Sequence, residues 1–311
     1  MEKFLTIIIP VHNRKELVGR TLHSLEAQTA RPLDIILVDN NSTDGTREEL
    51  TRWQSALDAP DFTIRVLDCD TPGAAAARNK GLEAVTTPWV MFFDSDDTMR
   101  PPHCSRVIDT ARSNPQLAII GWDVDVDMHL ADGSTRRGRF ARTSHWTNIF
   151  HGGFATQRWC ARTELVRKVG AWNPAAMIWN DIELGTRLLN AGGEIACIEG
   201  EPSVDVYHTS DSISTQPWLQ RLQRMDATAA IIENELPPEK RHWADYKRII
   251  AAGEALRCAP KDPEVAAAAR AIYSRALSRA GSFSRRMALR LAFNHIRRFP
   301  RGAAAILSLF K

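Results

Sequence analysis

The sequence has few cysteines and no long apolar run. The five cysteines are odd in number and contain no Cys-x-x-Cys pair; they are Cys69, Cys104, Cys160, Cys197 and Cys258. This pattern argues against a disulfide framework and a zinc site, and it favours a reducing compartment. No stretch of about 18 uncharged apolar residues occurs, so we expect no transmembrane helix. The first apolar run is stopped by Pro10, which favours a first strand over a signal peptide.

Charge is unevenly distributed along the 311 residues, although the net charge is only +3. Residues 239–311 hold 16 Lys and Arg but 5 Asp and Glu, a net of +11, whereas the preceding residues have a net charge of −8. This asymmetry predicts a basic appendage on an acidic body. We place the domain boundary after residue 215, which gives predicted domains at 1–215 and 216–311. Helical composition beyond it predicts helices at 218–235, 237–256 and 263–279.

The first hundred residues alternate between strand-like and helix-like segments. Apolar runs at 5–9, 34–38, 64–67 and 89–93 are typical of buried strands, and helical spacing appears between them. This rhythm predicts an α/β fold with a parallel sheet and right-handed crossovers. Open α/β sheets bind ligands outside the carboxyl ends of their strands, so we expect the functional residues directly after these runs.

Three carboxylates, Asp94, Asp96 and Asp97, follow the fourth apolar run. Carboxylates crowded at a strand end repel each other unless a positive charge is close. Oxygen ligands of this kind suit Mg²⁺ or Mn²⁺, which keep open positions for water and substrate phosphates. The alternative is an acidic turn in which Asp97 caps the next helix.

Four segments in order resemble the family 2 glycosyltransferases, which have the GT-A nucleotide-diphospho-sugar fold. They are TIIIPVHNR, ILVDNNSTDGT, PGAAAARNKGL and VMFFDSDD. A fifth, Asn180 to Leu184 followed by Arg187, is similar to the family's acidic pair and downstream arginine. The resemblance covers residues 1–215 and implies a Rossmann-like GT-A fold. In this fold a mixed, mostly parallel sheet is flanked by helices, here with a helical C-terminal appendage.

The resemblance implies a nucleotide site built from the first three segments. Pro10, Val11 and His12 would lie against the base and ribose. His12 stands where the family commonly has tyrosine, and the alternative is that it faces solvent. Asp39 would read the uracil of UDP, unless it only forms an Asx turn. Arg78 would offer its planar donor fork to the base or diphosphate, unless it is a solvated charge on a packed, Ala-rich helix.

The same resemblance implies that the acidic triplet is the metal and diphosphate site. Mn²⁺ or Mg²⁺ there would invert the local charge and stabilise the departing UDP. Asp96 would be a direct metal ligand, and Asp97 would share the metal or orient water. Asp94 and Ser95 would contact the donor. His208 would approach the diphosphate as a further metal ligand, or it would simply be satisfied locally.

Asp181 is the implied general base, which takes the proton of the acceptor hydroxyl as that oxygen attacks the anomeric carbon. The family usually has Glu before this Asp, and here the residue is Asn180. Glu183 is the rival base, and in the other interpretation Asn180 or Asp181 is only an N-cap. Trp172 or Trp179 is expected to border an acceptor groove, although such residues are also ordinary core residues.

Residues 283–311 interleave six arginines with apolar side chains. This pattern is typical of a basic helix at an anionic membrane surface, and a solvated helical face is the alternative. The same charge could serve nucleic acid, but no recognition motif accompanies it, so we expect no nucleic-acid partner.

The sequence therefore predicts an inverting, metal-dependent glycosyltransferase. It would move a hexose-type sugar from a UDP-sugar to a glycan or lipid-linked acceptor, as in cell-surface polysaccharide or lipopolysaccharide synthesis. We expect a cytoplasmic location, or a peripheral one on the inner face of the cell membrane. The alternative is a catalytically silent sugar-nucleotide or glycan-binding protein on the same fold. A nucleotidyltransferase is disfavoured because residues 5–16 lack a Gly-rich, basic phosphate loop.

Overall fold

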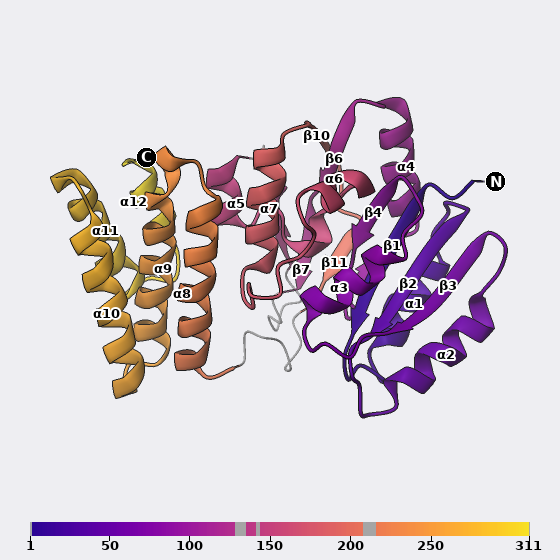
Figure 1. The fold of residues 1–311 in the computed structure, drawn as a ribbon, viewed down its shortest axis with the longest axis horizontal. Coiled ribbons are helices and arrows are strands. Elements are labelled where there is room, and N and C mark those ends of the chain that lie inside the picture. The colour runs from indigo at the N-terminus through magenta and orange to yellow at the C-terminus, as the bar shows by residue number, and fades with distance from the viewer. Residues whose placement is uncertain (1, 128–134, 141–143, 208–215, 311) are drawn as a thin grey trace. The chain divides into compact units, whose positions relative to one another are not determined.

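The computed structural model describes residues 2–127, 135–140, 144–207 and 216–310 (Figure 1). The chain folds as two compact units. The first comprises Met1–Asn148, Gly152–Pro174 and Arg187–Thr209, and the second comprises Ile149–His151, Ala175–Thr186 and Ser210–Lys311. Helix α7 (Asn180–Ala191) contributes residues to both units. The boundary after residue 215 stays a prediction.

A seven-stranded sheet forms the centre of the first unit, with the strand order β10-β6-β9-β4-β1-β2-β3. The strands are β1 (Leu5–Val11), β2 (Leu33–Asp39), β3 (Phe62–Asp68), β4 (Trp89–Phe92), β6 (Leu117–Trp122), β9 (Trp159–Arg162) and β10 (Glu194–Ile198). Strand β9 runs antiparallel to β4 and β6, and the other neighbouring pairs are parallel. The predicted mixed, mostly parallel sheet is confirmed.

Helices connect the strands of this sheet. They are α1 (Val18–Glu26), α2 (Thr46–Leu57), α3 (Ala74–Glu83), α4 (His103–Ser113), α5 (His145–His151) and α6 (Thr163–Lys168), with a 3₁₀ turn η1 (Thr156–Arg158). Every residue of β1 and β2 is buried, as expected of parallel strands covered on both faces. In α1 the buried apolar residues Val18, Leu22 and Leu25 recur at helical spacing, which is why this segment packs as an amphipathic helix.

Helix α3 lies close against the sheet because it carries a glycine at the contact. A Cβ atom at Gly81 would stand 2.5 Å from Cγ2 of Ile8 on β1. Ala75 and Ala77 on the same helix are also buried. The Ala-rich helix therefore packs tightly, and this packing places Arg78 near the carboxyl ends of the strands.

A second sheet of the first unit has the order β5-β11-β7-β8. Its strands are β5 (Thr98–Met99), β11 (Val204–Val206), β7 (Val124–Asp127) and β8 (Thr135–Gly138). Arg100, next to β5, donates hydrogen bonds to Asp205 (2.7 Å) and Asp125 (2.9 Å), and so ties β11 and β7 to the end of the acidic motif.

The second unit is mainly helical. Its helices are α8 (Trp218–Glu235), α9 (His242–Cys258), α10 (Pro263–Arg279), α11 (Phe283–Ile296) and α12 (Ala303–Ser308). The predicted bounds of α8 and α10 are confirmed. Helix α9 begins later than predicted because Pro237 and Pro238 lead into a separate 3₁₀ turn, η3 (Pro238–Lys240). The tail divides into two helices, and Gly302 before α12 has a left-handed φ of 100°.

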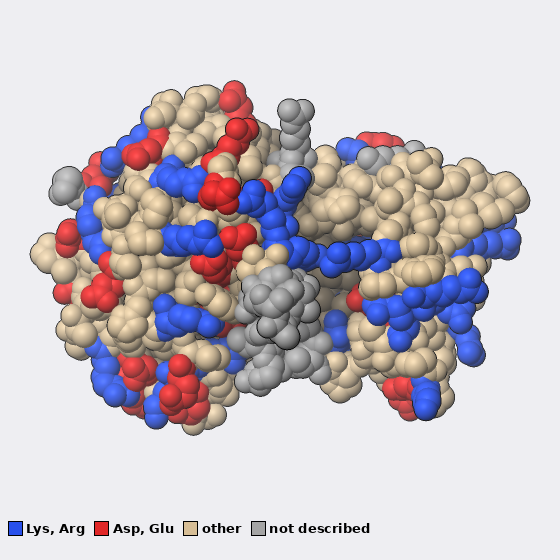
Figure 2. Space-filling model, turned by 180° about the vertical axis from the view of Figure 1, so that it is seen from behind, with Lys and Arg blue, Asp and Glu red and all other residues tan. Residues whose placement is uncertain are grey.

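The C-terminal helices carry charge of mainly one sign. Residues 265–311 contain nine Arg and one Lys but no Asp or Glu. Figure 2, in which these helices lie at the right, shows mainly basic charged side chains on that face of them. Four large apolar side chains there are also exposed, by 47–80%: Phe283, Leu291, Phe299 and Leu309. The C-terminal helices and their turns therefore expose apolar side chains in a segment whose charges are all basic.

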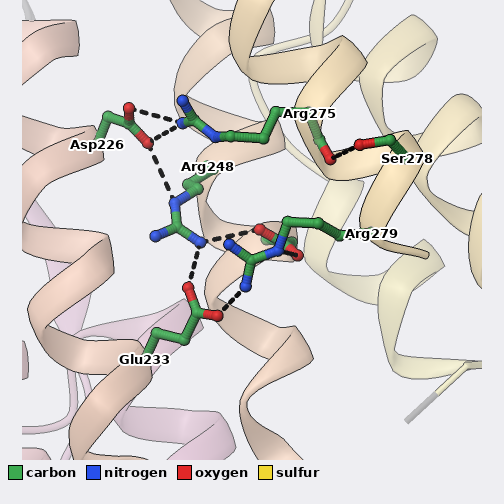
Figure 3. Close-up of polar contacts among 7 residues, drawn as sticks. Asp226, Glu233, Arg248, Arg275, Ser278 and Arg279 are labelled. Atoms are coloured by element: carbon green, nitrogen blue, oxygen red, sulfur yellow. Dashed lines mark hydrogen bonds and ion pairs between the residues drawn. The ribbon is translucent and has the colours of Figure 1, made fainter. Parts of the chain in front are cut away.

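A buried arginine lies in an ionic network that joins three helices of the second unit (Figure 3). Arg248 on α9 donates hydrogen bonds to Asp226 (3.1 Å) and Glu233 (2.7 Å) on α8, and to Asp245 (2.8 Å) one turn earlier. Arg275 on α10 completes the pairing of Asp226 (2.6 Å). Arg279, also on α10, pairs with Glu233 and with Asp245. The network fixes how α9 is rotated against its neighbours.

All five cysteines are free thiols; Cys69, Cys104 and Cys160 are buried. Within the part of the chain that the structure describes, no helix has both the length and the hydropathy needed to cross a membrane.

Candidate functional site

The carboxyl ends of β1, β2 and β4 meet at one edge of the main sheet. Val11, the last residue of β1, is in register with Asp39, the last residue of β2. On the other side of β1, Ile8 is in register with Phe92, and Asp94 follows two residues later. Three of the sequence motifs are therefore neighbours in space, as the parallel sheet predicts.

Asp39 has a buried carboxylate with spare acceptor capacity. The residue is 6% exposed, and its Oδ2 accepts a 3.3 Å hydrogen bond from the backbone N–H of Ser42. Its Oδ1 is buried and has no hydrogen-bond partner among the described residues. Buried acceptors are rarely left unsatisfied in folded proteins. The atom is therefore suited to a donor N–H supplied by a ligand.

Pro10 and Val11 are buried in the sheet, whereas His12 is exposed. The ring of His12 is nevertheless anchored, because its Nδ1 lies 2.7 Å from the carbonyl oxygen of Asn40. The contact with a base remains a prediction for all three residues.

Asn40 is a positioning residue that sequence reasoning missed. Its side chain donates to the carbonyl oxygens of Cys69 (2.9 Å) and Thr71 (2.7 Å), and it accepts a 2.7 Å hydrogen bond from the N–H of Gly73. Asn40 thus joins the end of β2 to the start of α3. A lone asparagine in a polar loop gives no signal by which this role could have been found.

Arg78 is buried and pairs with the acidic motif. Its Nη2 donates a 2.7 Å hydrogen bond to Oδ1 of Asp94, and its guanidinium lies 4.3 Å from the centre of the Trp172 ring. Nε and Nη1 of Arg78 are buried without a hydrogen-bond partner among the described residues. Gln157 donates to the other oxygen of Asp94, a contact for which there is no local signal in the sequence. Asp94 is therefore oriented from two sides.

Asp97 is the most deeply buried of the three acids, with 1% exposure. Its carboxylate accepts a 2.9 Å hydrogen bond from the N–H of Tyr207, and its carbonyl oxygen accepts a 2.8 Å bond from the hydroxyl of Thr21. Burial raises the pKa of Asp97 well above its ordinary value, and the carboxylates of Asp94 and Asp96 raise it further. Such crowding of negative charge favours a cation at this strand end.

Within the described ranges, no group of three or more His, Cys, Asp or Glu side chains is arranged to hold a metal ion. Mg²⁺ at phosphates is commonly held by one or two carboxylates, with the remaining positions filled by phosphate oxygens and water. Asp96, which is half-buried, and Asp97 fit this kind of ion as a pair of oxygen ligands. His208 lies outside the described residues.

Asp181 belongs to the second unit and lies in the first turn of α7. The residue is half-buried, and its Oδ1 accepts a 2.8 Å hydrogen bond from the N–H of Ile182. Glu183, the rival base, is only 1% exposed. Arg187, which belongs to the first unit, donates to the carbonyl oxygens of Val169 and Ala171 and so supports the loop after α6.

The expected aromatic border of an acceptor groove is wrong for Trp172. This residue is 1% exposed and packs edge-on against Phe92, with ring centres 5.1 Å apart, beneath Arg78. Its indole is therefore part of the core, where it supports the buried guanidinium of Arg78. Trp179 is half-buried, and for it the groove remains a prediction.

A mostly parallel sheet with acidic groups at its carboxyl edge defines an open α/β protein with its candidate ligand site at that edge. Residues 6–169 match the sequence model of glycosyl transferase family 2. Because this segment is more than half of the chain, the protein belongs to that family, and the predicted family membership is confirmed.

Two curated relatives illustrate the likeness. An uncharacterised glycosyltransferase of Haemophilus influenzae is 34% identical over 117 residues, which cover 37% of this chain and 37% of the relative. The putative teichuronic acid biosynthesis glycosyltransferase TuaG of Bacillus subtilis is 37% identical over 94 residues, 30% of this chain and 36% of the relative. The matched segments thus span only about a third of the curated relatives.

Solved structures extend the likeness of fold over nearly the whole chain. S. aureus TarS 1-349 in complex with UDP-GlcNAc has a TM-score of 0.64 at 15% identity, and the match covers 97% of this chain and 88% of TarS 1-349. The mannosyltransferase PcManGT of Pyrobaculum calidifontis, in complex with GDP-Man and Mn²⁺, has a TM-score of 0.56 at 18% identity, covering 98% and 87%. The TM-scores show a shared fold, and the predicted GT-A architecture is confirmed.

Proposed function

We propose that this protein is an inverting, metal-dependent glycosyltransferase. It moves a hexose-type sugar from a UDP-sugar donor to a glycan or lipid-linked acceptor of the cell-surface polysaccharide type. One observation carries the proposal: a carboxylate oxygen of Asp39 has no hydrogen-bond partner among the described residues and lies at the same sheet edge as the acidic triplet, of which Asp97 is buried. The teichuronic acid relative and the neighbours with bound nucleotide sugars support this direction.

The donor lies along the carboxyl edge of the sheet. Asp39 accepts a hydrogen bond from the uracil, while the chain at Pro10, Val11 and His12 lies against base and ribose. The spare N–H groups of Arg78 bind a phosphate oxygen, because a buried guanidinium with free donors favours an anion. Asp94 and Ser95 then contact the ribose or the sugar.

Asp96 and Asp97 would hold Mn²⁺ or Mg²⁺, and His208 is a candidate further ligand. Bound there, the ion would supply positive charge that stabilises the departing UDP. The protein's contribution is to fix Asp97 through Tyr207 and Thr21, so that its carboxylate is in place before the donor binds.

Asp181 serves as the base. The acceptor oxygen forms a bond to the anomeric carbon, the bond from that carbon to the diphosphate oxygen breaks, and the acceptor proton passes to the Asp181 carboxylate. Partial exposure favours Asp181 over Glu183, whose side chain is buried.

A panel of UDP-sugars tests the proposal by release of UDP with Mn²⁺, with Mg²⁺ and with a chelator. Release should require a divalent ion and should select one sugar. Asp96→Ala should lose metal-dependent UDP binding by calorimetry while keeping its near-UV circular dichroism. If UDP binds with the same affinity in chelator as with a divalent ion, the proposed metal dependence is wrong. Binding without release or transfer would favour the alternative, a catalytically silent sugar-nucleotide-binding protein.

The second unit is proposed to dock on an anionic membrane from the cytoplasmic side, where a lipid-linked acceptor would be reached. Helices α11 and α12 and the turns beside them carry arginines and four exposed apolar side chains: Phe283, Leu291, Phe299 and Leu309. Each basic residue near an anionic surface contributes about 1 kcal/mol, and apolar side chains add to this by insertion.

Flotation with vesicles containing phosphatidylserine tests the docking. Full-length protein should bind at low salt and be released at high salt. Phe283→Ser with Leu309→Ser should weaken binding at constant charge. Arg290→Gln with Arg297→Gln should weaken binding at low salt and make the remaining binding less sensitive to salt. Protein that does not float with such vesicles would refute the docking. The proposed sugar transfer would be unaffected by that result.

A further inference from the structure

Lys247 on α9 is a half-buried cation that the proposed chemistry does not use. Its ammonium donates a 2.6 Å hydrogen bond to the carbonyl oxygen of Ile149 and lies 4.6 Å from the centre of the Trp179 ring. All three residues belong to the second unit. A lysine held between a carbonyl and an aromatic face is confined, because both contacts favour the charged form in one position.

Trp179 leads directly into the helix that carries Asp181. Its φ of 60° is left-handed, an uncommon and strained conformation for a bulky residue. Its carbonyl oxygen accepts a 2.9 Å hydrogen bond from the N–H of Glu183, so the first turn of α7 is built on this residue. A group that holds the Trp179 ring therefore also holds the turn that contains Asp181.

The charge of Lys247 acts on the same carboxylate. Burial lowers the pKa of Lys247 to about 8, while the carboxylates of Asp181 on α7 and Glu254 on α9 raise it. Coupling between two charges is reciprocal. The ammonium of Lys247 therefore favours the ionised form of Asp181 by the amount that Asp181 favours the ammonium.

The ionic network around Arg248 explains why Lys247 is available for this role. Arg248 fixes the rotation of α9 against α8 through Asp226 and Glu233, and Arg275 and Arg279 on α10 pair with the same two carboxylates. Successive residues of an α-helix point about 100° apart, so the preceding side chain leaves α9 in a different direction. That direction is toward Trp179 and Ile149.

We propose that Lys247 is a positioning residue for Asp181: it holds the Trp179 turn and keeps the base ionised for proton transfer. This inference rests on the proposed function, because it assigns a role to the neighbour of its base. It also makes the C-terminal helices part of the reaction machinery.

The first test is the pH dependence of kcat for sugar transfer in the wild type, Lys247→Met and Lys247→Arg. Losing the cation should move the acidic limb of the profile to higher pH by about one unit, because an opposite charge lowers a carboxylate pKa by this order. Lys247→Arg keeps the charge and should stay near the wild type. Lys261→Met removes an exposed lysine and serves as the matched control. An acidic limb that coincides in Lys247→Met and wild type overturns the proposal.

The second test does not depend on activity. Lysines are labelled by reductive ¹³C-methylation, which keeps their charge, and the Lys247 resonance is titrated by NMR in wild type and Asp181→Asn. Lys247 should titrate near pH 8 in the wild type and at lower pH in the variant. Equal midpoints would show that the two groups are not coupled and would overturn the proposal. A wild type without transfer at any pH would overturn the proposed function instead, while the titration still decides the coupling.

Discussion

Arg78 on α3 donates a 2.7 Å hydrogen bond to Asp94 at the end of β4. The pair joins two motifs through a guanidinium that is almost fully buried over Trp172. Because Gln157 contacts the other oxygen of Asp94, the carboxylate has one fixed orientation. Two nitrogens of Arg78 keep donor capacity, since they have no hydrogen-bond partner among the residues described.

Arg78→Lys should weaken UDP binding by about tenfold or more, because a lysine keeps the charge but loses the planar donor fork. Calorimetric titration with UDP and Mn²⁺ measures the effect. Lys80→Met, on the same helix and exposed, should leave the affinity unchanged. An Arg78→Lys protein with wild-type UDP affinity would mean that the guanidinium serves only to orient Asp94.

Asp39→Asn should lower UDP affinity by about 10- to 100-fold, in line with about 1–3 kcal/mol for a buried acceptor that loses its partner. The loss should be smaller for CDP, because cytosine has no N3–H to donate. Asp68→Asn is the matched control, since Asp68 ends β3 in register with Asp39 but is exposed. Equal losses for UDP and CDP would contradict base reading by Asp39.

The strands and their ligand-binding edge could be predicted from sequence because buried parallel strands are continuous apolar runs, each followed directly by its motif. The partners of those motifs could not. Gln157 reaches Asp94 across 63 residues, and Asn40 binds the start of α3 through one amide. Such contacts are set by tertiary packing and leave no local pattern. The prediction that Trp172 borders a groove fails for the same reason. The sequence pattern around an aromatic residue is the same whether the residue lies in a core or at a groove.

Asp181→Asn should reduce transfer by about 10²-fold or more, because the amide keeps the size of the side chain but cannot accept the proton. UDP affinity should change little. Glu183→Gln is the paired variant, and we expect its turnover to stay much closer to the wild type. The opposite ranking, measured by product formation at saturating donor, would transfer the role of base to Glu183.

Arg248→Met should destabilise the second unit by about 1.5–3 kcal/mol, because three carboxylates lose a charged hydrogen-bond donor and keep only Arg275 and Arg279 as partners. Arg248 is 4% exposed, and three acids converge on it. Urea unfolding followed by tryptophan fluorescence measures the change. Arg270→Met, on α10 and exposed, should cost far less. A near-neutral Arg248→Met would show that the three carboxylates take up protons or water without loss of packing.

His103 should make the first unit acid-sensitive. Its Nδ1 lies 2.8 Å from the hydroxyl of Ser203, and its Nε2 is buried without a hydrogen-bond partner within the described part of the chain. Burial lowers its pKa from the ordinary 6.5 to about 3, and Arg106 adds to the shift. The folded state thus holds His103 neutral, whereas the unfolded chain binds a proton below pH 6.5.

The free energy of unfolding should therefore fall as pH drops from 6.5 toward 3, and the contribution of His103 to that slope should approach about 1.4 kcal/mol per pH unit. His103→Phe keeps a ring against Trp122, whose centre lies 4.5 Å away, and removes the titrating group. Urea unfolding at several pH values should give a shallower slope for the variant. The comparison of slopes cancels both the lost Ser203 contact and the carboxylates that titrate in both proteins. Parallel slopes would mean that the imidazole accepts a proton inside the fold, with Nε2 reaching water or another acceptor.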